Sequence, residues 1–99
     1  METNEISIHQ VRVFIAARSA IGKWLTANQL AKNALVAPRT ARHHAKRLLE
    51  LGVFDMAAVF PGHRYKFNEI AEKRNKAYMI RLEKAIEVFQ LINDTIGEN

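Results

Sequence analysis

The residues of this chain that could do chemistry are mostly cations, and they gather in its first half. Eight lysine and arginine residues lie between Ile6 and Leu49, a stretch that contains no aspartate or glutamate. From Leu51 to the end, seven cations face seven carboxylates, so the net charge of +5 arises in the first half. A merely solvated surface normally mixes both signs. A surface without acids instead suits an anionic partner such as the phosphates of a nucleic acid.

The densest group of cations follows Pro38. Placing the residues after this proline at the 100° steps of a helix puts Ala41, Ala45 and Leu48 on one apolar face. The polar side chains then fall on the opposite face and its flanks. The candidate contact residues of this segment are Arg39, Thr40, Arg42, His43, Lys46 and Arg47.

Other kinds of chemistry find no support in the sequence. The chain has no cysteine, which excludes disulfides and thiolate-ligated zinc. Its four glycines stand singly, and no phosphate-binding loop, nucleophile motif or H-x-x-E-H pattern occurs. His43 and His44 are neighbours, and neighbouring helical side chains diverge too far to share a metal easily. We therefore expect no catalysis, no metal and no cofactor.

The length and ends of the chain narrow the class further. Ninety-nine residues allow one core. The apolar stretches are short and interrupted by charge, so we expect no membrane span. The first five residues are acidic and polar, unlike a secretory signal. We expect a cytoplasmic protein.

Capping signals divide the first half into three helices. Ser7–Gln10 and Thr26–Gln29 each fit a capping box, in which a hydroxyl and a glutamine side chain satisfy the first backbone groups of a helix. The first helix is expected to end at Gly22, after an apolar stripe that includes Val11 and Phe14. A third helix is expected from Pro38 to about Leu51, because proline suits a first helical position.

After Gly52 the pattern changes to that of strands. Residues 53–60 are rich in apolar and β-branched side chains, and residues 64–67 alternate basic with aromatic. The turn signal Pro61–His63 between them predicts an antiparallel hairpin. From residue 68 or 69 to about residue 96 the chain contains neither proline nor glycine, and its apolar residues recur at helical spacing. This pattern predicts one long helix.

The stretch from Trp24 to Phe67 resembles the winged helix-turn-helix superfamily of bacterial and phage transcriptional regulators. The matching parts are the L-T-A-N-Q-L-A of residues 25–31, a turn at residues 35–37, and the segment of residues 38–54 that runs into Gly52-Val53-Phe54. The resemblance implies a mainly α fold with a small β-hairpin, namely a winged helix-turn-helix plus a long C-terminal helix. The turn lacks the glycine that is usual in this superfamily.

The resemblance also implies roles for the polar residues. A helix such as the one after Pro38 fits the major groove of B-form DNA, where base edges are read. We expect Arg39, Thr40, Arg42 and His43 nearest the bases, with Lys46 and Arg47 at phosphates. Arg64, at the hairpin tip, would enter a minor groove or rest on phosphate, with Lys66 beside the backbone. The alternative for the hairpin is a plain turn with Arg64 in water.

The predicted long helix has an apolar heptad stripe, a seam that must pack against another surface. Its apolar positions follow steps of four and three, and Asn75 fills one polar slot, where a buried asparagine could set the register. A second copy of the chain would cover the seam, and two-fold dimers suit palindromic DNA sites. The alternative is packing onto the first helix. The expected dimerisation residues are Tyr78, Leu82, Ala85, Phe89 and Ile92.

Together these expectations describe a DNA-binding domain over residues 1–67 and a C-terminal helix over residues 68–99, a dimerisation element of the same domain. The expected function is sequence-specific binding of double-stranded DNA by a homodimeric transcriptional regulator. Two alternatives stay open: a protein–protein adaptor that does not bind DNA, and a replication or partition module of a plasmid or phage. The sequence does not give the operator, the direction of regulation or an effector.

Overall fold

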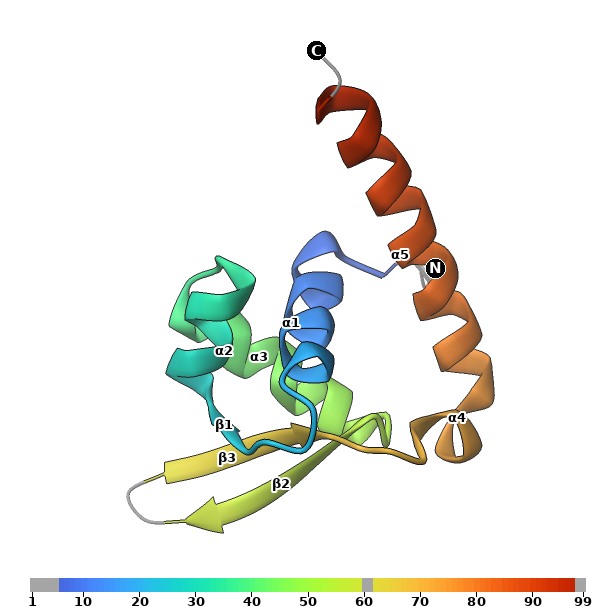
Figure 1. The fold of residues 1–99 in the computed structure, drawn as a ribbon. Helices are drawn as coiled ribbons and strands as arrows, with labels where there is room; N and C mark the ends of the chain where they lie inside the picture. The colour runs from blue at the N-terminus through green and yellow to red at the C-terminus, as the bar shows by residue number, and fades with distance from the viewer. Residues whose placement is uncertain (1–5, 60–61, 98–99) are drawn as a thin grey trace, which may run out of the picture.

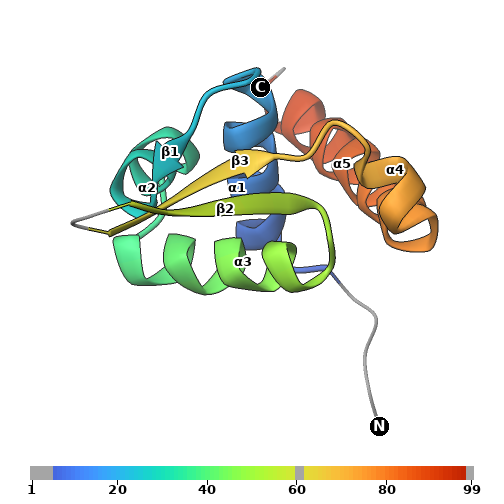
Figure 2. The same cartoon turned by 90° about the horizontal axis from the view of Figure 1, so that it is seen from below.

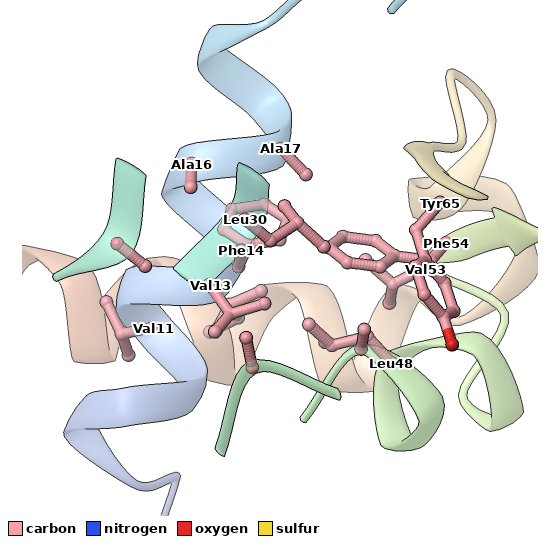
Figure 3. Packing of buried hydrophobic residues seen from close by; sticks show 14 of the residues in the cluster. Val11, Val13, Phe14, Ala16, Ala17, Leu30, Leu48, Val53, Phe54 and Tyr65 are labelled. Carbon is pink, nitrogen blue, oxygen red and sulfur yellow. The ribbon is translucent and has the colours of Figure 1, made fainter. Parts of the chain in front are cut away.

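The core forms where α1 (Ile8–Ser19) crosses α2 (Ala27–Ala34), α3 (Pro38–Glu50) and a small sheet. The structure is a computed structural model that describes residues 6–59 and 62–97, with side chains as far as residue 91. Figure 3 shows Phe14 and Leu30 at the centre, with Leu48, Val53 and Phe54 beside them. All five side chains are fully buried. Burying a side chain of this size stabilises the fold by about 1.5–3 kcal/mol.

The first two helices begin as the capping signals predict, with one correction. Thr26 and Gln29 form the complete reciprocal box at the start of α2. At the start of α1, the Ser7 hydroxyl accepts from the backbone N–H of Gln10 as expected. The side chain of Gln10, however, does not return to Ser7. It donates to the hydroxyl of Tyr78 in the last helix, because that distant partner lies against α1 in the folded chain.

The first helix is shorter than predicted. It ends at Ser19, and Gly22 lies beyond it in a turn with a φ of 72°. Val13, Ala16 and Ala17 join Val11 and Phe14 in the core, because α1 is covered on more than one side. Ile21 is 84% exposed.

The helix after Pro38 is confirmed. Pro38 occupies the first turn, Gly52 takes a φ of 83° just beyond the end, and Ala41, Ala45 and Leu48 are 0% exposed. In the turn before it, Leu35 takes the left-handed conformation, with a φ of 60° and a ψ of 45°. A leucine therefore stands in a left-handed conformation that glycine adopts far more readily.

Three antiparallel strands complete the fold, in the order β1 (Leu25–Thr26), β3 (Gly62–Phe67), β2 (Phe54–Val59). The register pairs Leu25 and Met56 with Tyr65, and Tyr65 is buried. Figures 1 and 2 show the β2–β3 hairpin extending past the helices as a wing, on the side of the N-terminal end of α3. The predicted order of three helices followed by a hairpin is thus confirmed.

The last helical segment is not continuous, and this corrects the prediction. A short helix, α4 (Ala71–Arg74), is followed by Asn75, whose φ of −150° and ψ of 71° are not helical, and then by α5 (Lys76–Gly97). Asn75 lies outside both helices, so it cannot set the register of a heptad seam. Its side chain instead bonds Leu51 and the start of α5.

The inner face of α5 packs on its own chain. Tyr78 is 5% exposed and Leu82 is 0% exposed, with Met79 and Ile86 buried beside them. Arg18 of α1 pairs with Glu83 of α5 at 3.4 Å, and the guanidinium of Arg12 lies over the ring of Phe89. The first part of the predicted seam is therefore used within the chain, which was the alternative left open above.

Candidate nucleic-acid interface

The polar side of α3 is presented to solvent. Because Ala41, Ala45 and Leu48 fix the opposite side of the helix in the core, the cationic side cannot turn inward. Thr40 is half-buried on the flank. The exposed side chains of this face are Arg39, Arg42, His43, Lys46 and Arg47.

One of these cations has a neighbour on the wing. Arg42 and Arg64 line the same groove, of about 370 Å³, between α3 and β3. Thr26, Ala27 and Asn28 close it with the first turn of α2. The N-terminal end of a helix carries a partial positive charge. Two guanidinium groups and this helix end therefore give the groove a positive potential, and none of its lining residues carries a negative charge.

The two wing cations predicted from the sequence lie in different surroundings. Lys66 does not line the groove that holds Arg64. Its ammonium lies 4.7 Å from the centre of the Trp24 ring, and the register places it opposite Asp55. Asp55 in turn accepts hydrogen bonds from Asn68 and pairs with Arg74 at 3.3 Å. Lys66 is thus engaged at the base of the wing.

At the far end of α3, Arg47 pairs with Glu50 at 3.6 Å. Both side chains are more than half exposed, and exposed pairs of this kind contribute at most about 1 kcal/mol. The pair is therefore weak enough to open when a phosphate approaches Arg47.

Three histidines meet beside this face. The ring centroids of His43 and His44 lie 5.0 Å apart, and those of His44 and His9 lie 6.4 Å apart. The pKa of His44 is lowered by burial and further by the charges of His43 and His9. Over the described residues, no group of three or more histidine, aspartate or glutamate side chains has the arrangement of a metal site.

A second groove, largely apolar and of about 470 Å³, runs between the start of α1 and the middle of α5. Ala85 and Phe89, both expected at a dimer interface, lie in it half-buried. Val88 lies beside them and is 58% exposed. Ile92 belongs to α5, but its side chain lies outside those described. The groove is completed by Ile6, Ile8, Val11, Arg81 and Lys84.

Sequence reasoning missed two parts of these surfaces. It did not find Val88 and Ile8, because they fall outside the heptad positions and meet only when α1 and α5 pack together. It also did not assign Asn28 to the groove beside Arg64. The capping box at Thr26 fixes the start of α2 and was the available signal for that helix end.

Within the described residues, no helix is long and apolar enough to cross a membrane.

The fold matches solved structures, although no protein-family model and no curated protein matches the sequence. A MarR family transcriptional regulator from Silicibacter pomeroyi aligns over 97% of this chain with 21% identity and a TM-score of 0.61. The chain spans 56% of that protein. Sso10a-2, a DNA-binding protein from Sulfolobus solfataricus, aligns over 89% of this chain and 88% of its own, with 9% identity and a TM-score of 0.58.

A third similar structure is that of Lactococcus lactis ZitR in complex with DNA. It aligns over 95% of this chain and 65% of its own, with 14% identity and a TM-score of 0.53. At these identities the likeness concerns the fold. The chain has a winged helix-turn-helix fold, with α2 and α3 as the helix-turn-helix, β2 and β3 as the wing, and α5 as a long C-terminal helix.

Proposed function

We propose that this protein is a sequence-specific regulator of transcription that binds double-stranded DNA. One observation carries the proposal: the exposed side of α3 is cationic, and at its N-terminal half Arg42 meets Arg64 of the wing in a common positive groove. A protein surface of one sign, spread over a helix and a neighbouring hairpin, suits two adjacent stretches of a duplex.

In the proposed complex α3 lies in the major groove. Arg39, Arg42 and His43, together with Thr40, face base edges, while Lys46 and Arg47 bind phosphates on either side. Arg64 reaches the backbone or the minor groove next to α3. Lys66, engaged with Trp24, is the weakest of these contacts. The ZitR structure in complex with DNA supports this use of the fold.

We further propose that the regulator is a homodimer, and that a second copy covers the groove between α1 and α5. Tyr78 and Leu82 are already buried within the chain, so the apolar surface that this groove offers a partner includes Ile8, Val88 and Phe89. Two copies related by a two-fold axis would place two α3 helices on successive half-sites of a palindrome.

The proposal is tested by selecting bound sites from random duplex DNA and measuring affinity for the selected site against salt. Binding through about six phosphates gives a log–log slope of about −5. Recovery of a palindromic site supports a dimeric regulator. A protein-binding adaptor would retain no duplex at any salt concentration. Sites found only as arrays of direct repeats would instead favour a replication or partition module.

A further inference from the structure

The three histidines form a continuous row from the DNA-facing side of the protein to its first helix. His43 is exposed on α3, His44 is half-buried next to it, and His9 stands in the first turn of α1. The centroid distances of 5.0 Å and 6.4 Å mean that a proton on one ring is felt by the next.

Two features make His44 resist protonation while the protein is free. The Nδ1 atom of His44 is buried and has no hydrogen-bond partner among the described residues. Burial, with the charges of His43 and His9, lowers the pKa of His44.

Cations surround the exposed side of the row. On α3, Arg39 and Lys46 lie one turn before and after His43 on the exposed side, and the carboxylate of Glu50 is taken up by Arg47. On α5, the facing titratable group is Tyr78, whose hydroxyl accepts from Gln10 of α1 and which lies within the fields of Arg47 and Arg81. Cations thus outnumber carboxylates near the three rings.

A bound duplex reverses this field. Phosphates that approach Arg39, Lys46 and Arg47 bring negative charge to the exposed side of α3, where His43 stands. Negative charge within a few ångströms favours the protonated imidazole. A group that gains a proton on binding makes the affinity depend on pH, by at most tenfold for each proton and pH unit.

We propose that His43, at the exposed end of the histidine row, couples DNA binding to the uptake of a proton, so that the protein binds its site more tightly in mildly acidic surroundings. His43 receives the proton at the DNA surface, while the half-buried His44 beside it stays neutral. This inference rests on the proposed DNA binding.

The experiment measures affinity for a selected site between about pH 7.5 and pH 5.5, and counts protons by calorimetry in two buffers of different ionisation enthalpy. The parent for all variants carries His63→Gln, which removes the wing imidazole from the titration. We expect binding to tighten about three- to tenfold over this range, with net proton uptake. His43→Gln should lose both effects and bind at low pH as the parent does at high pH.

Two further variants separate charge from shape. His43→Lys keeps a cation at all these pH values, so it should bind tightly with no dependence on pH. His44→Gln removes the buried neutral imidazole and keeps His43, so the rise in affinity should stay as in the parent. Circular dichroism at each pH verifies that every variant is folded.

The outcomes distinguish this inference from the proposed function. If no duplex is bound at any pH or salt concentration, the DNA-binding proposal is wrong. If the parent and His43→Gln bind DNA with the same pH dependence and the same proton count, DNA binding stands and the coupling is overturned.

Discussion

Asn75 connects the end of α3 to the beginning of α5. Its side-chain amide donates to the carbonyl of Leu51 at 3.0 Å, and its side-chain oxygen accepts from the backbone N–H of Tyr78 at 3.2 Å. The first bond satisfies a carbonyl at the end of α3, and the second caps the new helix. One side chain thus ties the end of α3 to the first turn of α5.

We therefore expect Asn75→Ala to lower the free energy of unfolding by about 1–3 kcal/mol, because it removes a helix cap and leaves a carbonyl without its partner. Urea unfolding followed by circular dichroism measures the loss. Asn33→Ala, an exposed position on α2, is the matched control and should change stability by less than about 0.5 kcal/mol. Equal effects of the two substitutions would contradict the role given to Asn75.

Leu35 stores backbone strain in the turn between α2 and α3. Its φ of 60° costs a leucine about 1–2 kcal/mol, and the side chain is 82% exposed, so it returns little packing energy. Leu35→Asn, with a side chain that tolerates this conformation, should raise the free energy of unfolding by about 0.5–1 kcal/mol. Leu35→Ala keeps the strain and should not stabilise. Thermal unfolding of the three proteins decides between these results.

Arg39 and Lys46 are predicted to differ in kind. Arg39→Ala should cost about 1–3 kcal/mol on the preferred site and relax the preference at one base position. Lys46→Ala should weaken binding to all duplexes alike and reduce the magnitude of the salt slope by about 1. Titrations against the selected site and a scrambled duplex at several salt concentrations measure both. If Arg39→Ala loses the same affinity for both duplexes, Arg39 does not read a base.

Much of the fold could be predicted because local signals coincide with it. The capping box at Thr26, the proline at the start of α3 and the glycine after its end mark boundaries that depend on the backbone alone. The alanine face of α3 follows from helical spacing, and with it the direction of the cations. These local rules suffice for the part of the surface carried by one helix.

The errors arose where a distant partner overrides a local pattern. Gln10 has the spacing of a capping box, but its side chain donates to the hydroxyl of Tyr78 and not to the backbone of the cap residue. Asn75 lies in a sequence pattern that continues through one helix. In the structure its side chain donates to the carbonyl of Leu51, and the helix is interrupted at this residue. The apolar groove between α1 and α5 likewise depends on two segments that no short-range signal relates.

The groove between α1 and α5 makes a prediction about assembly. Val88→Glu places a carboxylate on its apolar wall and should shift a dimer to monomer, because a buried unpaired charge is costly. Ile80→Glu, on α5 but outside this groove and 49% exposed, is the matched control. Sedimentation equilibrium gives the mass of each. A dimer that survives Val88→Glu but not Ile80→Glu would move the interface to the other side of α5.

His44 predicts a loss of stability in acid that is independent of DNA. Its pKa in the folded protein lies below the ordinary value of 6.5, first because of burial and then because of His43 and His9. The unfolded chain therefore binds a proton more readily than the folded one. It follows that the contribution of His44 to stability is present above about pH 6.5 and is lost as the pH falls from there through the lowered value.

His44→Gln should flatten this part of the stability curve, measured by urea unfolding at a series of pH values. The control, His63→Gln on the exposed wing, should leave the slope of the free energy of unfolding against pH unchanged. If both variants retain the full acid loss, some other group carries it and His44 is not held neutral by its surroundings.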